Sequence, residues 1–229
     1  MSLAPGCLPT SCGERGVIAN RSVRRYALRM RTAFKEWAIV VDALGRGEQI
    51  LVLRKGGIAE GRGGFQMEHP QFLLFSTLFH QQRESVLPSA QKRYDEIAPR
   101  LAGPDIIRVE YFAEVAAWRS LDNLSSAESL RGQHIWRDEV IAARFDWGRA
   151  QSIYAIAVRI HRLPLPIELP ASPAYGGCKS WVEFDKDIPT AGALPVLDQQ
   201  AFDRKLQQFF SALNPVMIRG ESSPTPGTL

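Results

Sequence analysis

The sequence predicts an α+β fold with mixed, mainly antiparallel strands in a twisted sheet or a small barrel, and with flanking helices. Two observations support this prediction. Stretches in which apolar and polar residues alternate, as in strands, are interspersed with stretches of helical periodicity. They do not follow the regular strand–helix–strand order of a doubly wound parallel sheet. We expect residues 31–214 of the 229 to form a single globular domain.

The apolar pattern over residues 34–44 fits two structures. A helical stripe and a strand-like alternation both pass through Trp37 and Val41, so both interpretations stay open. Glycines 45 and 47 then predict a turn. Short strands are predicted over three β-rich runs: residues 49–53, 65–68 and 72–75.

The middle of the chain predicts a helix followed by a long strand. The helix begins at Pro88 and ends before Gly103. Strict alternation over residues 106–118 predicts a strand with one buried face and one partly solvated face. Phe112 and Glu114 fall on the partly solvated face.

The C-terminal half continues the mixture of helices and strands. A helix is predicted with an inward face made by Trp136, Val140, Ala143 and Trp147. The prolines between residues 164 and 173 predict an irregular crossing, because proline cannot donate a ladder hydrogen bond. The remaining elements are strands over 153–163 and 179–184 and an amphipathic helix over 198–213. The order of elements resembles that of the PUA-like class of nucleic-acid and modified-base readers.

The charge of the chain is concentrated at its N-terminus. Residues 1–31 hold six arginines and one glutamate, whereas the rest holds 22 basic and 23 acidic residues. Residues 1–30 are expected to be a leader: sequence upstream of a true start at Met30, a disordered basic arm, or a transit peptide. Residues 215–229 are rich in Ser, Pro, Gly and Thr and are expected to be disordered. The body is therefore nearly neutral, and Met1 and Met30 both remain candidate starts.

Composition favours a cytoplasmic protein. No apolar run approaches the roughly 18 residues of a membrane span, and the N-terminus lacks the apolar core of a signal peptide. Three cysteines are too few for a disulfide framework, and only Cys178 lies outside the leader.

Two positively charged segments are candidates for binding nucleic acid. Arg54 and Lys55 precede Gly56-Gly57, where cations and free backbone N–H groups could meet a phosphate, although no P-loop motif is present. Lys179 and Trp181 follow a proline-rich loop. Other aromatic and basic residues interleave nearby, but Trp136 and most other tryptophans have the spacing of core residues.

Glu68, His69 and His80 are the candidate catalytic residues. Histidine titrates near neutrality and can act as an acid, a base or a metal ligand. No HExxH or CxxC motif accompanies these residues, so no metal site is predicted and no cofactor is indicated. The alternative is that they are hydrogen-bonded structural side chains.

Several enzyme classes are disfavoured by missing motifs. The glutamate-rich helix of Nudix hydrolases does not follow the glycines, and Gly-x-Ser-x-Gly is absent. A PD-(D/E)xK nuclease needs a carboxylate where Leu53 stands, even though Glu36 and Asp42 precede it.

Three blocks of sequence carry a resemblance to a known family. They are FKEWAIVVDALGRGEQILVLRKGGI followed by FxMEHPQFLLFSTLFHQQ, then HIWRDEVIAARFDW, then VRIHRLPLP with GCKSWVEF. Together they resemble an uncharacterised bacterial family, domain of unknown function 1802, with Ser76 departing from an expected proline. The resemblance implies no established activity. It does imply a link to restriction–modification, with a restriction endonuclease as a separate partner.

The sequence leaves three hypotheses for function. The first is a non-catalytic nucleic-acid recognition or accessory module that binds DNA or RNA. The second is a divergent metal- or acid/base-dependent enzyme acting on nucleic acid or nucleotides. The third is a small-molecule or protein-interaction domain whose glycine loops shape a pocket.

Overall fold

The computed structural model describes residues 29–55, 69–78, 80–101, 103, 105–148, 151–177 and 179–213. The strands are β1 (Arg29–Trp37), β2 (Leu51–Arg54), β3 (Gln71–Thr77), β4 (Ile106–Leu121), β5 (Ile153–Pro170), β6 (Trp181–Pro189) and β7 (Leu194–Pro195). The α-helices are α1 (Ala38–Gly45), α2 (Pro88–Ile97), α3 (Leu124–Glu128), α4 (Asp138–Asp146) and α5 (Gln199–Leu213). Short 3-10 turns are formed by His80–Gln82, Ala98–Arg100 and Pro173–Tyr175.

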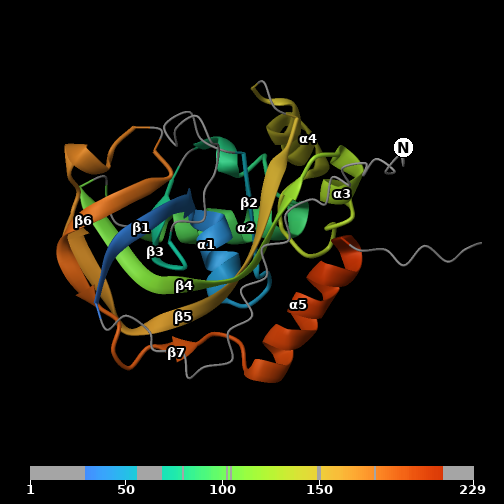
Figure 1. Ribbon diagram of the computed structural model, residues 1–229. Helices are drawn as coiled ribbons and strands as arrows, with labels where there is room; N and C mark the ends of the chain where they lie inside the picture. Colours follow the sequence, from blue (N-terminus) through green and yellow to red (C-terminus); the bar gives the residue numbers. More distant parts are fainter. Residues whose placement is uncertain are drawn as a thin grey trace, which may run out of the picture.

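All these strands belong to one sheet in the order β2-β5-β4-β3-β1-β6, with β7 paired to β5. β1 and β3 run parallel, and the other pairs are antiparallel. Figure 1 shows β4 and β5 as long, curved strands, with α1 near the middle of the view and α5 at the lower right. The predicted α+β fold is confirmed. Among the described residues no backbone ladder joins β2 to β6, so the sheet is twisted and open rather than a closed barrel.

The segment over residues 34–44 combines both predicted structures. It remains a strand to Trp37 and becomes the helix α1 at Ala38. All of α1 except Asp42 is buried, so the helix has no polar face to mark its periodicity. Along β1, Phe34 joins the core around α1, whereas Ala33 joins a second core with Phe112 and Phe184. The sheet therefore buries both of its faces here.

β4 corrects the prediction of a partly solvated face. Phe112 and Glu114 are both buried, and Phe112 belongs to the second core with Ala33 and Phe184, which covers this face of the sheet. Register shifts between Val109 and Tyr111 and between Val115 and Ala117 also break the simple alternation.

The prediction of an irregular crossing at the prolines is wrong, because β5 continues through this segment to Pro170. Residue 162 of β5 pairs with residue 111 and residue 167 with residue 109, so residues 163–166 bulge out of the ladder. Pro164 and Pro166 lie in that bulge, where no ladder hydrogen bond is lost.

Two helices show how far periodicity locates a buried face. In α5, Phe202 and Phe209 are buried as predicted. In α4 the buried residues are Ile141 and Phe145 rather than the predicted stripe. Trp136 is buried but precedes the helix, and Trp147 follows it and is 52% exposed.

The predicted leader and tail lie outside the described residues, apart from Arg29 and Met30, which begin β1. The predicted strand over 65–68 lies outside them as well. None of the helices in the described ranges is both long and apolar enough to cross a membrane.

Candidate functional site

Side chains join the two edges of the sheet, although no backbone ladder does. Arg54 ends the edge strand β2, and its Nη2 donates a hydrogen bond to Ser180 Oγ, 2.5 Å away, just before the other edge strand β6. The Arg54 guanidinium also lies over the ring of Phe34, 4.8 Å from the ring centroid. The curl of the sheet therefore brings Arg54 to the start of β6.

Trp181 lies at the centre of a group of aromatic rings at this junction. Its ring centroid is 4.7 Å from that of Phe34, 5.0 Å from Phe72 and 4.9 Å from His69. We call Phe34, Arg54, His69, Ser180 and Trp181 the seam cluster. Three residues named from the sequence, Arg54, His69 and Trp181, thus come together from segments far apart in the chain.

The other two predicted nucleic-acid-binding residues flank the seam cluster. Lys179 is exposed and directly precedes Ser180. Lys55 follows Arg54, and its Nζ donates to the carbonyl of Phe145 at the end of α4, 2.8 Å away. Burial lowers the pKa of Lys55, and the nearby Asp146 acts in the opposite direction.

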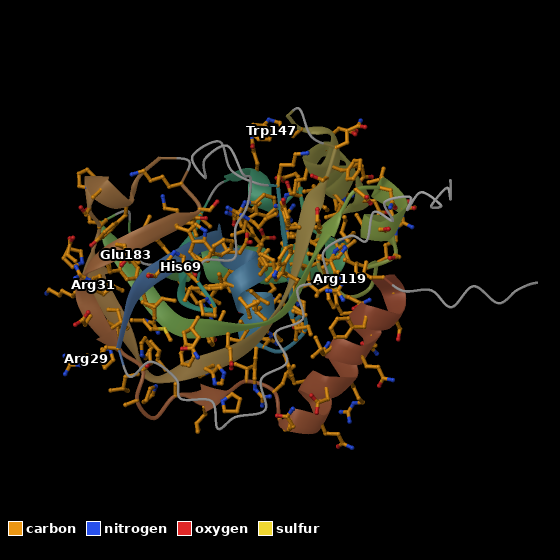
Figure 2. All side chains as sticks on the ribbon, in the orientation of Figure 1. Arg29, Arg31, His69, Arg119, Trp147 and Glu183 are labelled. Carbon is orange, nitrogen blue, oxygen red and sulfur yellow. The ribbon has the colours of Figure 1, made fainter. Side chains whose placement is uncertain are left out.

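Trp147 is a candidate that the helical periodicity placed incorrectly in the core. It follows α4 directly and is exposed, and Figure 2 shows it at the top of the molecule. The carbonyl of Phe145 and the space beside Gly148 both lie against Lys55, so Trp147 and Lys55 are close neighbours. The helix ends at Asp146, one residue before Trp147, so the helical spacing does not apply to Trp147.

The predicted catalytic residues are only partly placed. Glu68 lies outside the described residues, and of His80 the structure describes the backbone, in a 3-10 turn, but not the side chain. His69 packs edge-on against Trp181. Within the described ranges no group of three or more His, Cys, Asp or Glu side chains could hold a metal ion. The joint action of Glu68, His69 and His80 remains a prediction.

A partly buried arginine lies beside the seam cluster. The Arg144 guanidinium on α4 is packed between two indole rings, 4.7 Å from the Trp37 centroid and 5.1 Å from that of Trp136. Its Nη1 donates to the carbonyl of Leu53 on β2, 3.0 Å away. Burial lowers the pKa of Arg144 to about 10; the charge of Glu36 opposes this shift and that of Arg54 adds to it. Arg144 thus lies within electrostatic reach of both Glu36 and the seam cluster.

Glu36 is a buried acid that motif searching missed. The residue is 2% exposed, and its Oε1 accepts a hydrogen bond from the Trp37 backbone N–H at 2.7 Å. Its backbone carbonyl accepts from Thr77 Oγ1 at 3.0 Å. Oε2 has no hydrogen-bond partner among the described residues. The available signal was its position two residues after Phe34, on the inward face of β1.

Gln82, in the 3-10 turn, is likewise a buried polar residue with one side-chain atom hydrogen-bonded and the other without a partner among the described residues. It is 1% exposed, and its Nε2 donates to the Thr77 carbonyl at 2.8 Å. Its Oε1 has no partner in the described part of the chain. Glu36 and Gln82 are therefore both tied to Thr77, and each presents one unused acceptor.

The chain matches a family model over most of its length. No curated protein matches the sequence. Among solved structures it is similar to ASCH from Zymomonas mobilis, at 12% identity and a TM-score of 0.38, over 77% of this chain and 92% of that one. A mutant form of ZmASCH gives 12% identity and a TM-score of 0.39, over 79% and 96%. Likenesses this distant say nothing about the activity of this chain.

The family match covers residues 33–208 and so includes all five residues of the seam cluster, together with Glu36, Gln82 and Arg144. It also spans every block of sequence that carried the resemblance to domain of unknown function 1802, from Phe34 to Phe184. The chain belongs to the family described as Domain of unknown function (DUF1802).

Proposed function

We propose that this protein is a non-catalytic nucleic-acid recognition or accessory module that binds a single strand at the seam cluster. The observation that carries the proposal is the convergence of Arg54, His69 and Trp181 at the junction of the two sheet edges. A cation beside aromatic rings is the combination with which proteins hold unpaired nucleotides, since the cation meets phosphate and the rings stack with bases.

The flanking residues extend this surface in two directions. Lys179 adds an exposed positive charge beside Ser180, and Lys55 adds another at the carbonyl of Phe145, two residues before the exposed Trp147. Because the body carries almost no net charge, we expect binding to depend on these local contacts rather than on a long-range field.

We include a restriction endonuclease partner and a link to restriction–modification because of the family resemblance alone. The alternative, a metal- or acid/base-dependent enzyme using Glu68, His69 and His80, predicts turnover of nucleic acid or nucleotides that His69→Ala abolishes without unfolding the protein.

The proposal is tested by charge reversal at an exposed lysine. Full-length protein is titrated with labelled single-stranded RNA and DNA and with duplex of the same length. We expect tighter binding to the single strands, and we expect Lys179→Glu to weaken it several-fold. Lys186→Glu is the matched control, because Lys186 is an exposed lysine further along β6. Equal effects of the two substitutions, or no binding by the unmodified protein, would refute the proposal.

A further inference from the structure

Glu36 is a buried acid near the seam cluster with one oxygen that has no hydrogen-bond partner among the described residues. A buried carboxylate normally has partners for both oxygens, because taking it out of water is otherwise unfavourable. Oε1 has the Trp37 N–H, but Oε2 has no hydrogen-bond partner in the described part of the chain. The Gln82 Oε1 is a second unused acceptor, tied like Glu36 to Thr77. The arrangement would accept hydrogen bonds from a donor-bearing group.

Glu36 lies on the face of β1 that carries Phe34 of the seam cluster. Phe34 and Glu36 are two residues apart on one strand, so they share a face and are separated by about 7 Å. Phe34 is the residue on which Arg54 and Trp181 both pack. The Arg144 guanidinium is influenced by the charges of Glu36 and Arg54 together. Glu36 therefore follows Phe34, the ring that β1 contributes to the seam cluster, on the same face of the strand.

We propose that Glu36 reads the edge of an unpaired base that carries an exocyclic amino group and lies against Trp181. This inference rests on the proposed function. The Oε2 atom would accept a hydrogen bond from the amino N–H, as carboxylates do from the cytosine amino group. Uracil and thymine have a carbonyl oxygen at that position, and a carboxylate facing a carbonyl is repelled. Cytosine and uracil are alike in size and stacking area, so their comparison isolates this contact.

The experiment compares oligocytidine with oligouridine of equal length in binding to the full-length protein. We expect about tenfold tighter binding of oligocytidine, in line with a hydrogen bond to a charged acceptor. In Glu36→Gln, which keeps the size of the side chain but can also donate, the preference should fall to within about twofold. Glu183→Gln is the matched control, because Glu183 is an exposed acid on β6 (Figure 2) and should leave the preference intact.

The outcomes separate this inference from the function on which it rests. If neither oligonucleotide binds, the proposed function fails and the inference fails with it. Equal binding of the two by the unmodified protein overturns the inference alone, and indicates that Oε2 meets a buried water instead. This comparison needs no variant, so it remains decisive even if Glu36→Gln does not fold. A preference that Glu36→Gln leaves unchanged also overturns it.

Discussion

The exposed ring of Trp147 is the clearest test of the proposed surface by a single residue. Large aromatic side chains usually bury most of their surface, so the Trp147 indole, which is 52% exposed, is available to stack with a base. We predict that Trp147→Ala weakens binding of single-stranded RNA about tenfold, since stacking contributes about 1–3 kcal/mol per base. The free energy of unfolding should stay within about 0.5 kcal/mol of the unmodified value.

A matched control distinguishes stacking from a general loss of apolar surface. Leu165 is 75% exposed, so Leu165→Ala removes exposed apolar area from β5 without removing a ring. Binding should be unaffected in this variant. Equal affinities of Trp147→Ala and the unmodified protein would exclude Trp147 from the binding surface.

His134 should make the stability of the fold depend on pH. Burial lowers the pKa of His134 from 6.5 to about 4, and the charges of Arg144 and Arg131 add to this effect against that of Asp138. Between pH 6.5 and 4 the unfolded chain therefore binds a proton that the folded chain does not, so stability falls as the pH falls. We predict that from pH 7 to 4.5 the unmodified protein loses about 2 kcal/mol more than His134→Asn.

Urea unfolding of both proteins at pH 7 and 4.5 measures this difference. Comparison with the variant cancels the contributions of other groups, among them Asp42, whose pKa is raised by burial. If the free energies of unfolding of the two proteins change equally with pH, the fold does not lower the pKa of His134.

The helix α4 is held to the sheet by polar contacts to β2 and to Lys55, which follows it. Arg144 donates to the Leu53 carbonyl from between two indole rings, and Lys55 donates to the carbonyl of Phe145. We predict that Arg144→Met lowers the free energy of unfolding by about 3 kcal/mol, because it leaves the buried charge of Glu36 without its opposing cation.

Arg144→Lys separates the role of the charge from that of the planar group. Lysine keeps the positive charge but cannot stack flat between two indoles, so it should restore less than half of the loss. Chemical denaturation checks both values. A loss below about 1 kcal/mol in Arg144→Met would show that α4 is anchored by its apolar face alone.

The sequence pattern located those helices and strands whose burial in the fold follows their own periodicity. The strands at β2 and β3 and the helices α2 and α5 lie where the sequence indicates, because each has one buried face or is a short β-rich run. Prediction failed where pairing decides the structure. β5 passes through its prolines because a bulge opposite residue 110 frees them from the ladder, and no local pattern contains that information.

The candidate site was predictable as residue types but not as a place. Arg54, His69 and Trp181 were selected from the sequence by residue type and by the glycine- or proline-rich segments near them. Their contact in the structure depends on how far the sheet curls. Glu36 carries no motif, and its importance comes only from burial with an unused oxygen. Such a feature becomes visible only once neighbouring side chains are in place.

The positive charge of the protein is unevenly distributed along the chain. The leader is strongly basic, whereas the rest of the chain is nearly neutral, so nucleic-acid binding by the full chain could come from either part. The seam cluster belongs entirely to the nearly neutral part. A binding measurement must therefore separate the two contributions.

The most direct test is the salt dependence of single-stranded RNA binding by the full chain and by residues 29–229, which begin with β1. Each is measured with Arg54→Ala and with Arg204→Ala, a control at an exposed arginine on α5. Our account predicts that residues 29–229 bind, that affinity falls with salt, and that only Arg54→Ala weakens binding and makes the salt dependence shallower. Binding that disappears with residues 1–28, or that is unchanged by Arg54→Ala, would contradict it.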